Sequence, residues 1–330
     1  MVTIKEIASH LNLSISTVSK GLRGATDVSY ETRREILKTA SSMGYESKRT
    51  PHNSKLERIC VFAENVGYKN TEQFGYEIIA GLKLAASRQN CKVDIVSSES
   101  SHSADFHYDE YMIQNNYKGG FALGFTLQDC FIKQLEKTTI PTVLLDNVLN
   151  NKYVARVGTD SFNGMALIVS HLHELGHRKI AMLNGEAKSL VSFERKQGML
   201  YKMKDLGMTV YPEIIVNGHY RRNSAKEFVS FFLQEGATAI VCASDMIANT
   251  VIRELYALGV RVPEEISVTG FDDLPIAKYS TPSLTTVRQN RLGIGQGVFY
   301  ILKNIEEDMY LHNLSLKPEL IIRDSTTSPK

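Results

Sequence analysis

The stretch TIKEIASHLNLSISTVSKGL (residues 3–22) decides the fold of the first part of the chain. Thr3 and Glu6 are spaced as a capping box, in which a hydroxyl and a carboxylate satisfy free backbone N–H groups at a helix start. The apolar residues after Thr3 follow the i, i+3, i+4, i+7 spacing of one helical face, namely Ile4, Ile7, Ala8 and Leu11. The pattern therefore predicts a first helix that begins directly after Thr3.

Two further short helices are expected in the same segment. Ser14 is a good N-cap for a second helix, whose Val18 and Leu22 share a buried face. A third helix follows Ser29 and ends at Gly44 as its left-handed C-terminal residue, with an inward face of Ile36, Leu37, Ala40 and Met43. Three short helices at this spacing are typical of a helix-turn-helix unit, although a small amphipathic bundle without a nucleic-acid role has the same spacing.

Charge favours the nucleic-acid interpretation. Residues 1–58 contain ten Lys or Arg against six Asp or Glu and are net +4, whereas the whole chain is net +2. The remaining 272 residues are therefore net −2, and the basic excess lies entirely in the first segment. Contact with DNA phosphates requires such an excess.

Several motifs along the chain resemble the lactose-repressor/galactose-repressor (LacI/GalR) family of bacterial transcription regulators. The first are TIKEIASHLNLSISTVSKGLRG and TRREILKTASSMGY, and the resemblance continues through LHELGHRKIAML, RKQGML, ASDMIA, LGVRVPEEISVTGFDD and PSLTTVRQN. It implies an N-terminal all-α helix-turn-helix headpiece followed by a two-lobed α/β periplasmic-binding-protein-like core. In that family the second helix lies in the major groove of DNA.

The residues that match the base-reading positions of that helix are Ile15, Ser16 and Lys20. Lys20 can donate to guanine O6 or N7, whereas Ile15 can make only apolar contacts such as with a thymine methyl group. Thr17 and Ser19 are expected to touch phosphate or the neighbouring helix. The full set predicted to contact DNA is Thr3, Ser14, Ile15, Ser16, Thr17, Ser19, Lys20, Arg23 and Leu56.

The linker after the headpiece departs from the family pattern. Members usually carry PNxxAxxL, a hinge helix whose leucine wedges into the minor groove, and an inserted wedge of this kind kinks DNA. Here the stretch reads ESKRTPHNSKLER, which is shorter, and Leu56 is its only leucine. The sequence leaves operator bending open, while Lys48, Arg49, Lys55 and Arg58 remain available for phosphate contacts.

From Arg58 onward, apolar runs alternate with helical patterns, as in parallel α/β sheets. The runs are too many for one compact sheet, so we expect two lobes. The family resemblance implies that the chain crosses between the lobes three times, and we place these crossings near Gly158, Gln289 and Leu320. The predicted boundaries are a headpiece at 1–45, a linker at 46–58 and a core at 59–330. Within the core, the N-lobe covers about 59–157 and 290–318, and the C-lobe covers about 158–289 and 319–330.

Ligands of open α/β sheets bind beyond the carboxyl ends of the strands, so the polar residues that end apolar runs are site candidates. Asp272 and Arg195 match the family's ligand-binding carboxylate and arginine, while Asp245 reads as a helix cap or loop stabiliser. Phe74 is as well explained by helix packing, and Ser244 stands where sugar-binding members often carry Asn. The full effector set is Phe74, Phe125, Asp146, Arg195, Tyr220, Ser244, Asp272 and Gln289.

The resemblance implies a repressor of a carbohydrate-utilisation operon that acts as a homodimer on double-stranded operator DNA. A sugar or sugar phosphate bound between the core lobes would control it. A nucleobase effector and a lost effector response are the alternatives. Tetramer formation, the operator sequence and the sign of the ligand response stay open. The apolar stretch IIAGLKLAA is explained equally by dimerisation and by helix-on-sheet packing.

Other functional classes find little support. No run of about eighteen apolar residues and no signal segment is present, so we expect a cytoplasmic protein with no membrane partner. The four cysteines are scattered and read as buried free thiols, and the histidines give no metal-binding spacing. Neither GxGxxG nor GxxxxGK[ST] follows a strand, and Asp272 with Asp273 lacks a catalytic partner. We therefore expect no cofactor, no metal and no enzymatic activity, and a solute-binding protein is disfavoured.

Overall fold

The computed structural model describes residues 2–23, 28–43, 45, 57–64, 66–97, 106–218 and 224–330. Contacts between residues divide the chain into two compact units. Unit 1 contains Met1–Asn65, Leu82–Arg156 and Val298–Asn313. Unit 2 contains Val66–Gly81, Val157–Gly297 and Leu314–Lys330.

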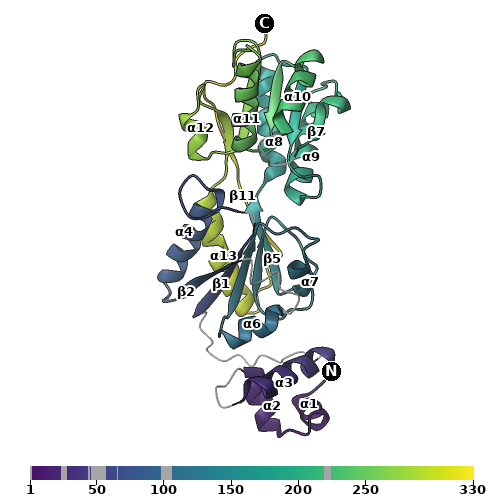
Figure 1. Cartoon of the computed structure of the whole chain (residues 1–330), viewed down its shortest axis with the longest axis vertical. Helices are drawn as coiled ribbons and strands as arrows, with labels where there is room; N and C mark the ends of the chain where they lie inside the picture. Colours follow the sequence, from purple (N-terminus) through teal and green to yellow (C-terminus); the bar gives the residue numbers. More distant parts are fainter. Residues whose placement is uncertain are drawn as a thin grey trace. The chain divides into compact units, whose positions relative to one another are not determined.

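The headpiece consists of three helices, α1 (Ile4–His10), α2 (Ile15–Arg23) and α3 (Tyr30–Ser42) (Figure 1). The predicted capping box is confirmed, because Thr3 Oγ1 accepts from the Glu6 N–H and the Glu6 carboxylate accepts from the Thr3 N–H. Ser14 Oγ accepts from the Thr17 N–H at 2.9 Å and so caps α2 as expected. The helices share a small core of Ile7, Ala8, Val18, Ile36 and Ala40.

Several sequence predictions fall outside the described residues. These are Gly44 as the helix end, Leu56 as a wedge, the linker basic residues Lys48, Arg49 and Lys55, and Tyr220 as an aromatic wall. The side chains of Arg23 and Leu37 lie outside the description as well. After the linker, the Glu57 carbonyl already accepts from the Lys92 N–H at 2.8 Å, and β1 begins at Arg58.

The first sheet has six strands in the order β11-β5-β4-β3-β1-β2. Their bounds are β1 (Arg58–Ala63), β2 (Lys92–Ser97), β3 (Gly119–Leu123), β4 (Thr142–Leu145), β5 (Val154–Thr159) and β11 (Asn313–Leu316). β1 pairs in parallel with both β2 and β3, which buries its apolar run RICVFA on both faces.

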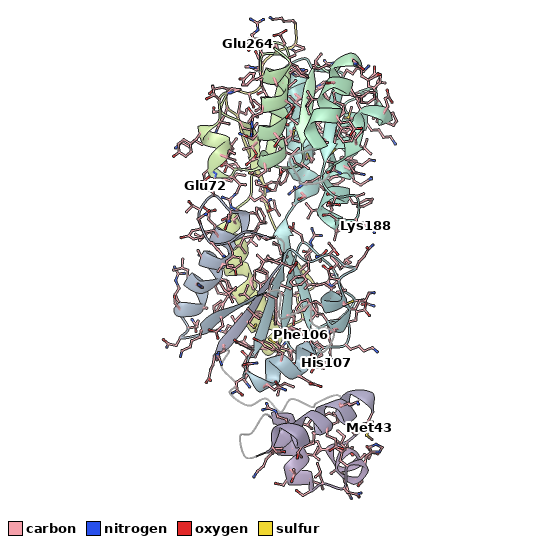
Figure 2. All side chains as sticks on the ribbon, viewed as in Figure 1. Met43, Glu72, Phe106, His107, Lys188 and Glu264 are labelled. Carbon is pink, nitrogen blue, oxygen red and sulfur yellow. The ribbon has the colours of Figure 1, made fainter. Side chains whose placement is uncertain are left out.

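Unit 1 has an aromatic core beside this sheet. The Phe62 ring on β1 lies 4.9 Å from Phe131 and 5.7 Å from Tyr108, which come from α7 (Cys130–Gln134) and α6 (Tyr108–Gln114). Phe106, labelled in Figure 2, packs on Phe62 at 6.0 Å between ring centroids. Neither α6 nor α7 was predicted from the sequence; α7, with five residues, is too short to show a repeated helical pattern.

The second sheet has the order β12-β10-β9-β8-β6-β7 and is parallel except for β12 at its edge. Its strands are β6 (Ile180–Asn184), β7 (Ile215–Asn217), β8 (Ala239–Cys242), β9 (Ser267–Asp272), β10 (Thr285–Arg288) and β12 (Glu319–Ile321). The helices of unit 2 are α8 (Ser161–Glu174), α9 (Leu190–Asp205), η1 (Pro212–Ile214), α10 (Ser224–Gln234), α11 (Asp245–Ala257) and α12 (Pro275–Tyr279) (Figure 1).

The apolar runs from Arg58 onward predict nine strands, from RICVFA to ELII, and all nine are present, but β5, β10 and β11 were missed. In their sequences, VARVGT, TTVR and NLSL, polar residues interrupt the apolar ones, so none forms an apolar run. β11 also alternates exposed and half-buried positions at a sheet edge, so it needs few apolar residues.

Two helices, α4 (Phe74–Ser87) and α13 (Arg291–Glu306), contribute residues to both units. As a result, unit 2 includes residues 66–81, 290–297 and 314–318, which the sequence prediction placed in the N-lobe. Most of IIAGLKLAA on α4 is buried within the chain, while Leu84 is 41% exposed. Packing within the protomer thus accounts for the larger part of that stretch.

The cysteines are free, and three of them are buried. The exception is Cys130, the first residue of α7, which is exposed and corrects the expectation of a buried thiol. Among the described helices, none combines the length and apolar character needed to cross a bilayer.

Candidate functional site

The exposed face of α2 carries the residues predicted to read bases. Ile15 is 52% exposed although it is a large apolar residue, and Ser16 and Lys20 are exposed as well. Val18, one turn along, is fully buried against α1 and α3. The helix contains no acidic residue. This face is therefore free of negative charge, a condition for close approach to phosphates.

The remaining predicted DNA contacts divide into two groups. Thr3, Ser14 and Thr17 are engaged in capping, and the Ser14 and Thr17 hydroxyls lie 2.8 Å apart. They also lie at helix starts, where phosphates are favoured. Ser19 is half-buried on α2.

Asp272 ends β9 at the carboxyl edge of the second sheet and is the centre of a buried polar cluster. Gln289 Nε2 donates to Asp272 Oδ1 at 2.7 Å, and Arg195 Nη2 lies 3.7 Å from the same oxygen. Asp272 has φ of 114° and Asp273 has φ of 52°, both in the left-handed region that disfavours non-glycine residues. The structure thus brings together three of the predicted effector residues.

The charge state of Asp272 reflects opposing influences. Burial raises the pKa of Asp272, whereas the positive charge of Arg195 and the Gln289 hydrogen bond lower it. Among the described residues, no donor lies within hydrogen-bonding distance of its second oxygen, Oδ2. One acceptor oxygen of a positioned carboxylate is therefore left for a further partner.

Arg195 is held rigidly on α9. Its side chain is 5% exposed, its Nη1 donates to the Ala243 carbonyl at 2.5 Å, and its guanidinium carbon lies 3.9 Å from the centroid of the Phe271 ring. The ring face and the carboxylate both compensate a cation that burial has removed from water.

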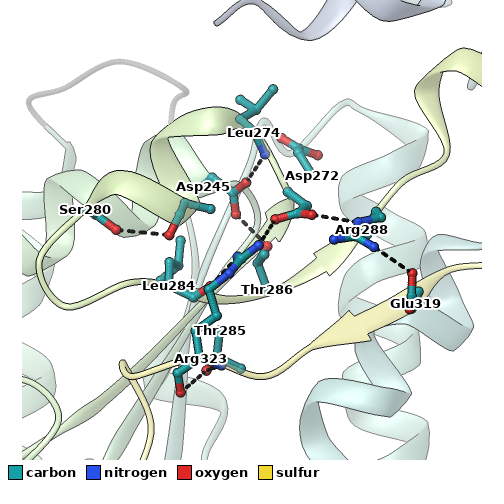
Figure 3. Close-up of polar contacts among 12 residues, drawn as sticks. Asp245, Asp272, Leu274, Ser280, Leu284, Thr285, Thr286, Arg288, Glu319 and Arg323 are labelled. Carbon is teal, nitrogen blue, oxygen red and sulfur yellow. Dashed lines mark hydrogen bonds and ion pairs between the residues drawn. The ribbon is translucent and has the colours of Figure 1, made fainter.

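Ser244 and Asp245 have structural partners at the start of α11. Ser244 is the N-cap and its Oγ accepts from the Ile247 N–H at 3.2 Å. Asp245 accepts from the Leu274 N–H at 2.7 Å and from Thr286 Oγ1 at 2.5 Å, as Figure 3 shows. Burial and the nearby charge of Asp272 raise the pKa of Asp245. Asp245 therefore stabilises the loop after β9, which the sequence had favoured over ligand contact.

Arg291 is a member of this cluster that sequence reasoning missed. Its Nη1 donates to the Asp272 carbonyl at 2.6 Å, and its Nε and Nη2 lie 3.1 and 2.9 Å from Glu77 Oε2. Its position two residues after Gln289, at the start of an apolar helix, was the available signal. A buried charge there needs a partner from elsewhere in the fold.

Asp273 has a structural role beside the cluster. It accepts from Arg288 at 2.7 Å and from Arg323 at 2.6 Å. Arg288 also donates to Glu319 at 3.0 Å (Figure 3). These pairs connect the ends of β9, β10 and β12 with the segment that follows β12.

The other predicted effector residues lie in different surroundings. Phe74 is the half-buried first residue of α4, and Asp146 is half-buried with φ of 58°. Phe125 is buried in unit 1 and stacks on Phe131 at 4.5 Å, so packing accounts for it. Asn184 at the end of β6 donates to the Ser192 carbonyl and to Asn217. In the described part of the chain, no group of three potential ligands is arranged to hold a metal ion.

Comparisons with known proteins match both parts of the chain. Residues 3–47 match the model of the bacterial regulatory proteins of the lacI family, and residues 169–326 match that of a periplasmic binding protein-like domain. A relative from Vibrio vulnificus, the HTH-type transcriptional repressor PurR, is 27% identical over 337 residues, with 98% of each chain covered. The protein of the same name from Aliivibrio salmonicida is 26% identical and covers 98% of this chain and 99% of its own.

Solved structures share the fold over the whole length. A complex of the transcriptional regulator CelR with cellobiose has a TM-score of 0.72 at 23% identity, covering 98% of this chain and all of that one. A lac repressor dimer bound to operator and the anti-inducer ONPF has a TM-score of 0.67 at 23% identity, covering 99% of both. The headpiece, the two-sheet core and the two family models agree. The chain therefore combines the DNA-binding domain of the lacI family of bacterial regulatory proteins with a periplasmic binding protein-like domain, which is the make-up of a DNA-binding transcriptional regulator.

Proposed function

We propose that the protein is a homodimeric repressor that selects an operator through α2 and responds to a carbohydrate or sugar phosphate bound at the carboxyl edge of the second sheet. Relatives of matching length are named as transcriptional repressors, which supports repression as the output. The two headpieces of a dimer would occupy half-sites about one helical turn apart.

The DNA-reading part of the proposal rests on the exposed face of α2. Ile15, Ser16 and Lys20 lie on one side of the helix and present an apolar contact, a hydroxyl and a cation. Together these can distinguish base pairs in the major groove, where thymine offers a methyl group and guanine offers two acceptors. Thr3, Ser14, Thr17, Ser19 and Arg23 are proposed to hold the backbone, which fixes the register.

The ligand-binding part rests on one observation, the open Oδ2 of Asp272 beside its engaged Oδ1. A carboxylate oriented in this way accepts hydroxyl donors, and neighbouring hydroxyls of a sugar are suited to it. Regulators solved with cellobiose and with ribose, the second from Enterococcus faecium, have the same fold. Phe74, Asp146, Ser244 and Tyr220 are proposed as further contacts.

A nucleobase is the second candidate ligand. Asp272 and Gln289 place a carboxylate acceptor next to an amide, and this pair also suits the donor and acceptor edge of a base. The relatives from Vibrio vulnificus and Aliivibrio salmonicida are both named PurR, which supports a nucleobase, whereas the structures with cellobiose and ribose support a sugar. Binding measurements are therefore needed to distinguish a sugar from a nucleobase as the ligand.

The test has two arms on the full-length protein. Selection of bound fragments from genomic DNA should recover a near-palindromic operator, and a protein without sequence preference would end the repressor proposal. Calorimetry with neutral sugars, sugar phosphates and nucleobases, repeated with Asp272→Asn, should find a ligand whose binding depends on the carboxylate. That ligand should change operator affinity by about 5- to 150-fold, the usual range of allosteric coupling. A ligand that leaves operator affinity unchanged would indicate a lost effector response.

A further inference from the structure

Unit 2 contains a half-open cavity of about 540 Å³ beside the first turn of α13. Most of its lining residues are polar or charged, and Leu292 is the one large apolar residue among the described lining residues. The lining consists of Glu77, Asp273, Arg288, Gln289, Asn290, Arg291, Leu292, Lys317 and Glu319. Gln289 also holds Asp272, so the cavity adjoins the polar cluster at the carboxyl edge of the sheet.

One cation at the cavity is left without an ion-pair partner. Asp273 accepts from both Arg288 and Arg323, and Arg288 also pairs with Glu319. The lining holds three cations and three carboxylates, but Asp273 is shared with Arg323, which lies outside the lining. Lys317 is exposed at the cavity and has no ion-pair partner among the described residues. This unpaired cation favours an anion over a cationic occupant beside it.

Arg291 and its partner differ in their access to water. The Arg291 side chain is 5% exposed, whereas Glu77 is 44% exposed and comes from the first turn of α4. The guanidinium is fixed in addition by its bond to the Asp272 carbonyl. Glu77 can therefore turn into water with little loss of solvation, while Arg291 stays in place and needs another anion.

We propose that this cavity binds an oxyanion, a carboxylate or a phosphate, which replaces Glu77 on Arg291 and pairs with Lys317. The guanidinium presents a planar fork that fits two oxygens, and Lys317 adds a point charge. The sixteen-residue helix α13 begins at Arg291, so its positive end also faces the oxyanion. The oxyanion is either the acidic group of the effector, in which case the inference rests on the proposed function, or a separate small anion.

Inorganic phosphate is the first probe, titrated into the full-length protein and followed by 31P NMR. Glu77→Gln should tighten phosphate binding about two- to fivefold, because it removes a competing, half-exposed ion pair. Arg291→Met should abolish binding, and Lys317→Met should weaken it about two- to fivefold. Lys204→Met, at an exposed lysine on α9, is the matched control and should change nothing.

Glu77→Gln makes the test independent of any folding defect, because a gain in phosphate affinity cannot arise from misfolding. Phosphate affinity that is unchanged in both Glu77→Gln and Arg291→Met would overturn the proposal. If the effector has an acidic group, Glu77→Gln should tighten its binding and Arg291→Met should weaken it. If the effector is neutral and neither substitution changes its binding, the cavity binds a separate anion. Operator selection by the unliganded wild-type protein is measured in parallel. Its loss would count against the proposed function and not against the anion site.

Discussion

The Gln289 side-chain amide donates to Asp272 Oδ1 at 2.7 Å, and this bond joins the end of β9 to the segment between β10 and α13. Gln289 is 3% exposed and Asp272 is 7% exposed, so the bond is shielded from water. The carboxylate is oriented by this amide, which leaves Arg195 to supply charge from 3.7 Å and Oδ2 to accept a ligand. A residue on the segment between β10 and α13 thus positions the carboxylate of the candidate effector site.

Replacement of Asp272 by Asn should affect both stability and ligand binding. The substitution removes the negative charge beside Arg195 and places an amide opposite the Gln289 donor. Removal of one partner of a buried ion pair typically lowers the free energy of unfolding by about 3–5 kcal/mol. Urea unfolding measures the change.

The matched control for that substitution is Asp205→Asn. Asp205 pairs with Lys202 at 2.7 Å, but its side chain is 49% exposed. A surface pair contributes about 0–1 kcal/mol, so the control should unfold almost as the wild type does. Equal stabilities of the two variants would show that the Arg195–Asp272 pair is not the buried interaction described above.

Lys20→Ala should lower operator affinity in a sequence-dependent way. Lys20 lies on the exposed face of α2, and loss of a specific contact to a base costs about 1–3 kcal/mol. Binding to random DNA should fall much less. Gel-shift titration of the selected operator against variants at each base pair provides the measurement, with Lys38→Ala, an exposed lysine on α3, as the control. A uniform loss across all sequences would reassign Lys20 to a phosphate contact.

Gly198→Ala should destabilise unit 2, because α8 and α9 pack closely there. A Cβ at Gly198 would collide with the Phe162 carbonyl oxygen and lie 2.9 Å from the Phe162 Cα, both parts of the backbone. Overpacking at such a site costs about 1–3 kcal/mol, so the urea midpoint should fall. Lys204→Ala on the same helix should leave the midpoint within experimental error, and the same result for Gly198→Ala would refute the tight contact.

Local patterns in the sequence predicted local structure well. Thr3 and Glu6 lie within one helical turn, so the capping box could be read directly, and the apolar runs marked nine strands. Asp272, Arg195 and Gln289 were identified by resemblance to family motifs, and the structure places them together.

What could not be predicted depends on pairs that are distant in sequence. Arg291 and Glu77 are 214 residues apart, and neither residue lies in a local sequence pattern that indicates its partner. That pair joins the first turn of α4 to the start of α13, and both of these segments belong to unit 2. The strand β10 was missed because its residues, TTVR, are mostly polar and form no apolar run, unlike the equally short β4 and β8.

The stability of unit 2 should fall as the pH is lowered below about 6.5, because of His177. Its Nε2 lies 2.9 Å from the Thr327 carbonyl, which can only accept, so Nε2 carries the proton and Nδ1 accepts from Thr238 Oγ1 at 2.9 Å. Burial lowers the pKa of His177 below its ordinary value of 6.5, against the raising effect of the Thr327 carbonyl, and burial also lowers the pKa of His171. The neutral rings are therefore favoured in the folded state.

The direction of this change in stability with pH follows from the number of protons that the folded and unfolded chains bind. Between the lowered folded pKa and the unfolded value near 6.5, the unfolded chain binds more protons than the folded one. Stability is thus fully present above pH 6.5 and is lost progressively below it, by at most about 1.4 kcal/mol per pH unit for each histidine. His177→Asn should lower the urea midpoint at pH 7.5 and reduce its slope between pH 7 and pH 5, whereas His312→Gln, at an exposed position, should preserve the wild-type slope. A wild-type slope in His177→Asn would mean that other groups cause the acid sensitivity.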